Sequence, residues 1–248
     1  MNLYARRRAL LGTASSGSPT VHGTWEDLFA RIADGTYATA YSVGEILPLD
    51  LGTHGAVDAQ IVAFNSDDKA DGSGKAPVTL VFKNCTTTTH RYNPQLSGSS
   101  GSRTIGTGCI GGWEHSELRT YVSGTLLPLI PSDIRARIVP VKKYSKIANS
   151  DETYTNNVET TDSLWCLSYR EVYNGNNSAE TIGPYYSSRF TNNSSRVIKN
   201  PSGTVKPWWL RSANNAVANT TYVTNSGGNT TYGQSTQPFN IVCGFCVG

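Results

Sequence analysis

Charged side chains are absent after Arg211, although the chain continues to residue 248. Residues 212–240 are dominated instead by Asn, Thr, Ser, Gly and Tyr, and they lie between apolar stretches at 207–210 and 241–247. Tyr provides contact area at low entropic cost, and small polar side chains provide adaptable hydrogen bonds. The segment is either a polar hairpin that closes the fold or a recognition surface. We favour a recognition surface, because a polar segment of low complexity between two apolar ends suits display better than linkage.

A strong net charge and long apolar runs are also missing. The formal net charge is +3, and no stripe of Lys and Arg interleaves with aromatic residues, so nucleic acid is not an expected partner. The apolar run after the arginines at 6–8 is too short for the core of a signal peptide, and no segment is long enough to cross a membrane. We therefore expect neither a standard export signal nor membrane insertion. The hydrophobic content of 38% is too high for a disordered chain and indicates a folded, loop-rich protein.

The cysteines number five, an odd count without the spacing of a disulfide-rich domain. Cys243 and Cys246 match the C-x-x-C redox pattern, but no βαβ pattern follows them, so we expect neither redox nor metal chemistry there. Every cysteine lies in or beside an apolar run, which predicts small buried side chains in a reducing compartment. The set is Cys85, Cys109, Cys166, Cys243 and Cys246.

No cofactor or metal ion is expected from the remaining polar clusters. The acidic stretch at 65–72 differs from a calcium-binding loop, because Lys69 stands where an oxygen ligand would be required and no closing Glu follows. A solvated turn is the favoured interpretation, although the sequence leaves calcium binding open. His54, His90 and His115 lack metal-ligand spacing and are expected to be ordinary turn or surface residues.

The chain divides into a flexible basic arm at 1–20 and one α+β domain at 21–248. Thr24 with Asp27 predicts the start of a helix that ends at Gly35. Its buried face is expected to consist of residues at helical spacing, namely Trp25, Leu28, Phe29 and Ile32.

The rest of the domain is expected to contain one longer helix and many short strands. The helix is predicted over 113–127, and shorter helical turns are expected to be capped by Ser132 and by Ser168 with Glu171. Residues 52–55 are expected to join two strands in a hairpin. The predicted strands span 41–51, 56–64, 78–82, 138–141, 164–167, 208–210, 220–224, 229–232 and 241–247.

Three short motifs carry a resemblance to a known family. They are GGWEHSELR at 111–119, WWLRS at 208–212 and CGFCV at 243–247. In this order they resemble the C-type-lectin-like variable proteins of diversity-generating retroelements, which occur in gut bacteria and their phages and are related to the phage major tropism determinant. The resemblance covers about residues 21–248 and implies a C-type lectin-like fold with short, irregular antiparallel strands and two main helices.

The same resemblance implies a mechanism of diversification in the region at about 212–240. In such systems a reverse transcriptase rewrites adenines, and Asn codons are the main targets. A rewritten Asn codon that keeps its final pyrimidine yields Tyr, Thr, Ser, Ala, Val, Phe, Asp or Gly, but never Gln. Residues 213–240 are rich in this set, and Gln234 and Gln237 are therefore expected to be fixed positions. Rewriting would also produce Asp, His and Arg, so their absence from residues 213–240 departs mildly from the expected outcome.

The implied function is ligand recognition without catalysis, by a phage tail-tip protein or a bacterial surface adhesin. The implied partner is a cell-surface protein or glycan receptor. Relatives of this kind are monomers or trimers, and the arm at 1–20 could mediate assembly or attachment to a virion. The alternative is an enzyme of the formylglycine-generating type, which has the same fold and uses paired cysteines. Cys243 and Cys246 oppose this alternative, because residues i and i+3 of a strand point to opposite faces.

Strand alternation and loop exposure predict the residues that contact the ligand. Tyr222, Tyr232 and Phe239 are the expected anchors, because aromatic residues dominate binding hot spots. The full predicted set is Asn214, Asn215, Asn219, Thr220, Tyr222, Thr224, Asn229, Thr230, Tyr232, Ser235, Phe239 and Asn240.

Tryptophans and charged residues next to the motifs are expected to form the scaffold. Tryptophans of this kind fill cores more often than they stack on sugars, and the set is Trp113, Trp208 and Trp209. The charged residues are expected to form one ion-pair network that holds the binding hairpin in place. They are Glu114, Glu117, Arg119 and Arg211.

Overall fold

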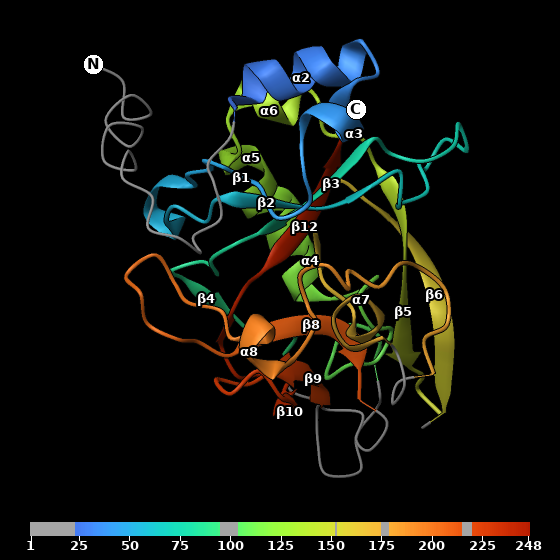
Figure 1. The fold of residues 1–248 in the computed structure, drawn as a ribbon. Coiled ribbons are helices and arrows are strands. Elements are labelled where there is room, and N and C mark those ends of the chain that lie inside the picture. The colour runs from blue at the N-terminus through green and yellow to red at the C-terminus, as the bar shows by residue number, and fades with distance from the viewer. Residues whose placement is uncertain (1–22, 95–103, 152, 175–178, 215–219) are drawn as a thin grey trace.

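The computed structural model describes residues 23–94, 104–151, 153–174, 179–214 and 220–248. They form an α+β fold with two five-stranded sheets, a separate two-stranded hairpin and short helices (Figure 1). The predicted α+β class is therefore confirmed. The arm predicted at 1–20 lies outside the described residues. Within the described ranges, no helix is both long enough and apolar enough to cross a membrane.

The first sheet contains the last strand of the chain as an interior strand. Each neighbouring pair in this sheet is antiparallel, and the order is β1-β2-β3-β12-β7. The closing strand contacts β3 on one side and β7 on the other, which explains why its apolar sequence is fully buried. The strands are β1 (Ile46–Leu47), β2 (Ala59–Phe64), β3 (Val78–Phe82), β7 (Trp165–Cys166) and β12 (Cys243–Val247).

The second sheet contains the polar hairpin near the C-terminus. Its order is β10-β9-β8-β11-β4, with one parallel contact between β11 and β8 and antiparallel pairing elsewhere. The strands are β4 (Thr89–His90), β8 (Trp208–Ala213), β9 (Thr220–Thr224), β10 (Thr230–Gln234) and β11 (Phe239–Asn240).

A long antiparallel hairpin of β5 (Val141–Ala148) and β6 (Tyr154–Asp162) runs along one side of the molecule (Figure 1). Of the residues in this hairpin, the sequence predicted only Val141 as part of a strand. The sequence of β6 is mainly polar and lacks a continuous apolar alternation, so only its pairing with β5 identifies it as a strand.

Two helices begin where their capping residues predict. Thr24 accepts a hydrogen bond from the Asp27 backbone, and Ser168 with Glu171 forms a complete capping box. Ser132 is the first residue of its helix and makes no capping bond, which corrects its expected role. The helices are α2 (Trp25–Ala33), α3 (Tyr37–Ala40), α4 (Glu117–Tyr121), α5 (Leu127–Leu129), α6 (Ser132–Arg135), α7 (Tyr169–Tyr173) and α8 (Asn193–Arg196), with a π-helical turn at Val122–Leu126 and a 3₁₀ turn at Gly52–His54.

The helix predicted from residue 113 starts later, at the cap Ser116. Gly111 and Gly112 have φ angles of +79° and +59°, so the chain enters through left-handed backbone that cannot be α-helical. A Cβ atom on Gly112 would lie 2.2 Å from Ile147 Cγ2. This close approach places Trp113 in the core before the helix begins.

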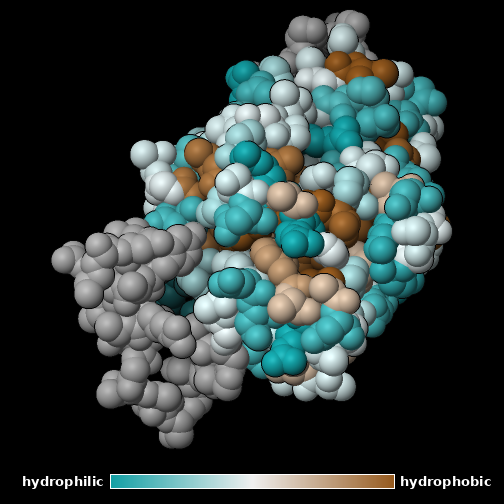
Figure 2. Space-filling model, turned by 90° about the horizontal axis from the view of Figure 1, so that it is seen from above, coloured by the Kyte–Doolittle hydropathy of each residue, from teal (hydrophilic) through white to brown (hydrophobic). Residues whose placement is uncertain are grey.

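All five tryptophans and all five thiols lie in one hydrophobic core. Trp113, Trp208 and Trp209 are fully buried, as the scaffold interpretation predicts, and Trp165 joins them. Figure 2 shows one outer face, on which the described hydrophobic side chains lie in patches interrupted by polar ones. Scattered apolar residues of this kind are ordinary for a protein surface.

Candidate functional site

The polar hairpin of β9 and β10 has a short turn that its own asparagine stabilises. Thr224 pairs with Thr230 across the hairpin, and Asn225 closes the turn. The Asn225 Oδ1 atom accepts hydrogen bonds from the backbone of Gly227 at 2.9 Å and of Asn229 at 3.1 Å. Asn side chains favour such turns because they can replace a backbone acceptor.

The tip of this hairpin packs against α7 and α8. The hydroxyl of Tyr173 donates a hydrogen bond to the Gly228 carbonyl at 3.0 Å, and Asn193 donates one to Asn229. Gly228 has a φ angle of +76°, and a Cβ atom there would lie 1.8 Å from the Asn193 carbonyl oxygen. Only glycine allows this contact, so the turn is held in one position on the domain.

The two strands of the hairpin differ in exposure. Within β9, Tyr222 is only 7% exposed because its ring packs on Tyr169 at a centroid distance of 4.7 Å. Its partner in β10, Tyr232, is 61% exposed. The physical reason is position in the sheet: β9 lies between two strands and under α7, whereas β10 is an edge strand.

The predicted ligand-contacting residues therefore separate into groups. Asn229 and Tyr232 are exposed, and Thr230 and Phe239 are half-buried. The side chain of Phe239 packs edge-on against Trp209. Asn215 and Asn219 lie outside the described residues, and Thr220 is described only as part of β9.

Five predicted contact residues are buried, and we do not include them in the surface proposed below. Asn240 donates a hydrogen bond to the Thr86 carbonyl at 2.7 Å, and the Thr224 hydroxyl lies 3.1 Å from the Tyr173 hydroxyl, within hydrogen-bond distance. These residues are buried because both faces of β9 and the segment after β10 are covered, which strand alternation alone does not predict. The buried residues are Asn214, Tyr222, Thr224, Ser235 and Asn240.

Asn193 is an exposed neighbour of the hairpin that the sequence did not indicate. It contacts Asn229, 36 residues further along the chain, and it lies on a helix of only four residues. No local pattern identifies such a neighbour, because only the fold brings α8 to the hairpin tip.

The base of the hairpin is tied to the core by a buried ion-pair cluster. Arg211 at β8 places Nη1 2.7 Å from Glu171 Oε2, and Lys143 Nζ lies 2.9 Å from Glu171 Oε1. Lys143 also binds Asp67, and Tyr186 donates a hydrogen bond to Asp67 at 3.1 Å. All five residues are at most 1% exposed, so both carboxylates are neutralised inside the protein.

This cluster corrects the expected ion-pair network. Glu117 binds Arg91 at 2.7 Å, and Arg119 binds Asp162 at 2.7 Å, so neither contacts Arg211. Glu114 lies beside His115 on the surface. The carboxylate that meets Arg211 belongs instead to the capping box of α7, which is distant in sequence but adjacent in space.

Asp67 also corrects the expectation of a fully solvated acidic turn. It is 1% exposed and accepts a hydrogen bond from Thr79 at 2.6 Å, in addition to its ion pair with Lys143. Its neighbours follow the prediction, since Asp68 is exposed and binds Lys75 at 2.7 Å.

Glu171 makes the cluster sensitive to acid. Burial alone would raise its pKa, but Arg211 and Lys143 outweigh burial and lower the pKa to about 2 from an ordinary value of 4.5. The ionised form of Glu171 is therefore more favoured in the folded state than in the unfolded state. Its stabilising contribution is complete above pH 4.5 and is lost as the pH falls through about 2.

We expect the free energy of unfolding of the native protein to fall steeply between pH 4.5 and 2. Urea unfolding measured at several pH values checks this, with Glu171→Gln as the test and the exposed Glu26→Gln as the control. The Glu171→Gln protein should lose less stability over this interval than the native protein, whereas the Glu26→Gln protein should follow the native curve. If the curves of unfolding free energy against pH are parallel for all three proteins, the acid sensitivity does not come from Glu171.

The cysteine pair of the C-x-x-C pattern is divided between two environments. Cys243 lies beside Cys166 in the sheet, whereas the Cys246 thiol lies 3.4 Å from Thr79 Oγ1. Burial raises the pKa of both Cys243 and Cys246 well above the ordinary thiol value. The two thiols therefore cannot bind one ion without rearrangement of the strand.

The histidines take part in local packing. His54 is hydrogen-bonded to the Tyr121 hydroxyl at 2.8 Å, and the His90 ring stacks on Tyr121 at 4.1 Å. Across the described ranges, no three His, Cys, Asp or Glu side chains are arranged to hold a metal ion.

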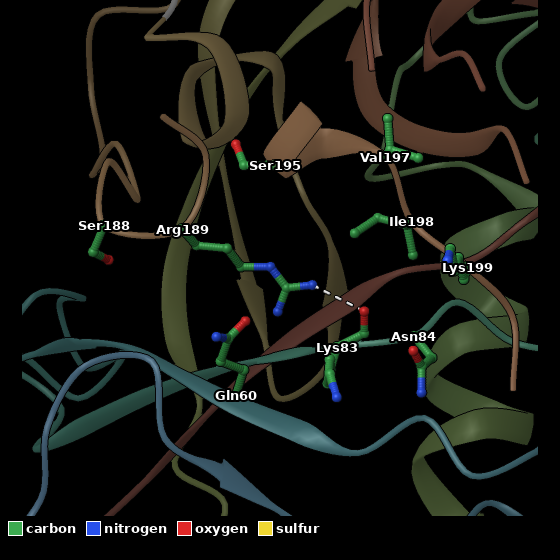
Figure 3. A pocket seen from close by; sticks show the side chains of 9 residues that line it. All are labelled: Gln60, Lys83, Asn84, Ser188, Arg189, Ser195, Val197, Ile198 and Lys199. Carbon is green, nitrogen blue, oxygen red and sulfur yellow. Dashed lines mark hydrogen bonds between the residues drawn. The ribbon is translucent and has the colours of Figure 1, made fainter. Parts of the chain in front are cut away.

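A pocket of about 320 Å³ lies away from the predicted contact residues. It is formed by residues of β2 and the end of β3 on one side and by the segment from Ser188 to Lys199 on the other (Figure 3). Arg189 projects into the space between these walls.

Comparison with known proteins identifies a family but no characterised relative. No curated protein and no solved structure matches the chain. One family model, described as "Domain of unknown function (DUF6273)", matches residues 108–246. This range is more than half of the 248 residues and includes the pocket segment at 188–199, the buried Arg211 and the polar hairpin. The chain therefore belongs to the DUF6273 family.

Proposed function

We propose that this protein binds a cell-surface protein or glycan through the β9–β10 hairpin, without catalysis. The observation that carries the proposal is the 61% exposure of Tyr232 in a hairpin without charged residues. Tyr is among the residues most enriched at binding hot spots. Asn229 and Thr230 lie next to it in the turn and on the same edge strand.

Rigid attachment of the hairpin supports a binding role. Its tip is fixed by Tyr173 and Asn193, and the neighbouring strand β8 is fixed through Arg211 and two buried tryptophans. A surface that is already ordered loses little conformational entropy when it binds. The anchors also let exposed side chains change without loss of the fold, since surface substitutions away from special features cost little stability.

We further propose that the domain is a C-type-lectin-like variable protein of a diversity-generating retroelement, displayed on a phage tail tip or a bacterial surface. The separation of exposed and structural positions supports this. Gln237 Oε1 accepts a hydrogen bond from the Gln234 backbone at 2.9 Å, so these two residues form a turn. A structural role suits positions that an adenine-rewriting process would leave fixed. Oligomeric display would multiply a weak contact into avidity.

The cheapest test of the retroelement is the neighbouring DNA. We expect a reverse-transcriptase gene and a near-copy of codons 211–248 that differs from them at adenines. A neighbourhood that lacks both would remove the support for diversification while leaving the binding surface to be tested separately.

We expect Tyr232→Ala to weaken binding by about 1–3 kcal/mol and to leave thermal unfolding nearly unchanged, because the side chain is exposed. Binding of labelled protein to a glycan array and to intact gut bacteria measures the effect. Ile182→Ala is the matched control, since Ile182 is an exposed apolar side chain outside the hairpin. Equal binding by the Tyr232→Ala, Ile182→Ala and native proteins would contradict the proposal.

A further inference from the structure

The pocket beside β3 is lined by cations without any carboxylate. Lys83, Arg189 and Lys199 contribute to its walls, and the other lining residues are neutral. Within the described part of the chain, none of the three cations forms an ion pair. Figure 3 shows the Arg189 guanidinium among the lining residues, with the Lys83 side chain extending away from it.

Arg189 is buried but is bound only by neutral acceptors. It is 9% exposed, and its Nη1 and Nη2 atoms donate to the backbone carbonyls of Val81, Phe82 and Lys83 at 2.7–3.2 Å. These three bonds use three of the five N–H donors of a guanidinium. The Nε–H and one Nη1–H have no acceptor in the described ranges.

An uncompensated buried guanidinium is costly. Burial lowers the pKa of Arg189, and no acidic neighbour opposes this effect. Buried charges in proteins are normally paired, because desolvation of a lone ion costs several kcal/mol. An anion in the pocket would supply the missing charge and accept one of the two remaining N–H bonds, which point in different directions from the planar guanidinium.

The neutral side chains of the pocket are already occupied. Ser188 donates to the Val62 carbonyl at 2.8 Å, Ser195 donates to Asn192 at 2.7 Å, and Gln60 donates to Gly44 at 3.0 Å. The guanidinium and the two lysine amines are therefore the charged groups with donors to spare, and the amides of Gln60 and Asn84 each keep one further N–H. Lysine side chains are long and flexible, so Lys83 and Lys199 can turn toward a bound anion.

We propose that this pocket binds a small molecule through one oxyanion group, a carboxylate or a phosphate, held by Arg189 and steadied by Lys83 and Lys199. Arginine presents several donors to such groups, and its charge strengthens each hydrogen bond. The volume of about 320 Å³ is at the lower end for small-molecule sites and exceeds what one inorganic ion fills. No residue of the hairpin lines this site, although α8 contacts the hairpin through Asn193 and the pocket through Ser195.

The test is titration of the full chain with inorganic phosphate, sulfate and acetate at constant ionic strength, followed by NMR of the Arg189 Nε–H and the backbone amides. We expect saturable shifts at Arg189 and at the end of β3. The Kd should rise at least about tenfold in Arg189→Gln and about three- to tenfold in Lys83→Ala/Lys199→Ala. Lys142→Ala is the control for loss of one positive charge, because Lys142 binds Glu159 on a different hairpin, and its Kd should match that of the native protein.

The double lysine variant decides the matter if Arg189→Gln does not fold, because neither lysine side chain makes an ion pair in the described residues. Phosphate and sulfate bound more tightly than acetate would identify a phosphate-like ligand, and the reverse order a carboxylate. Absence of saturable shifts for all three anions would overturn the proposal. So would a Kd that is equal in the native and double-lysine proteins, since the lysines that line the pocket would then take no part in binding.

Discussion

Replacement of Arg211 with Ala is expected to lower the free energy of unfolding by about 3–5 kcal/mol. Arg211 is 1% exposed and is the partner of Glu171, and it also donates to the carbonyls of Cys166 and Tyr144 at 2.7 and 2.9 Å. Its removal would leave a buried carboxylate with only Lys143 to neutralise it and would leave both carbonyls without this donor. Chemical unfolding measured by circular dichroism checks the expected loss.

The matched control for Arg211→Ala is Arg91→Ala. Arg91 also binds a glutamate, Glu117, with its Nη2 atom 2.7 Å from Oε2, but its side chain is half exposed. Solvent screens such a pair, so its removal should change stability far less. Equal stability losses for the two variants would show that burial of the Arg211 cluster contributes nothing beyond an ordinary surface ion pair.

Replacement of Gly228 with Ala is expected to cost about 2–4 kcal/mol, a second large effect. The substitution would place a methyl group 1.8 Å from the Asn193 carbonyl oxygen, at a φ angle of +76° that alanine disfavours. The hairpin tip must then move away from α8, and the hydrogen bond from Tyr173 to Gly228 should break. Thermal unfolding measures the loss, and the NMR signals of the hairpin should shift while those of β3 stay in place.

Gly227→Ala provides the control for this experiment, since Gly227 is the adjacent residue in the same turn. Its φ angle is not positive, and a Cβ atom there would meet only Asn225 and Asn229 side-chain atoms at 3.4 Å. We expect a small effect from this variant. If Gly228→Ala is as stable as Gly227→Ala, the hairpin tip is not fixed against α8, and the rigid-display argument loses its main support.

The Gly228→Ala and Tyr232→Ala variants together connect stability to the proposed function. Tyr232 is far more exposed than Tyr222 although they pair across the hairpin, because α7 covers only one of them. A loss of stability in Gly228→Ala together with a loss of binding in Tyr232→Ala would indicate a fixed hairpin tip with an exposed contact residue. The loss of stability is measurable without knowledge of the ligand.

Signals that depend on neighbouring residues in the chain were sufficient to predict many elements. The strands at 78–82 and 220–224 were predicted with their observed bounds, and the caps at Thr24 and Ser168 are present. These predictions succeed because a cap or a strand depends on side chains within a few residues of one another. The buried state of all five thiols was predictable for the same reason, since each lies in a local apolar context.

The sequence by itself thus determined the α+β class, the apolar core and the uncharged hairpin. Only the tertiary structure decided which residues meet across long separations. It paired Arg211 with Glu171, covered Tyr222 but not Tyr232, and placed Arg189 at the end of β3. No local pattern encodes these contacts, because ion pairing and burial depend on the final packing of elements that are far apart in the chain.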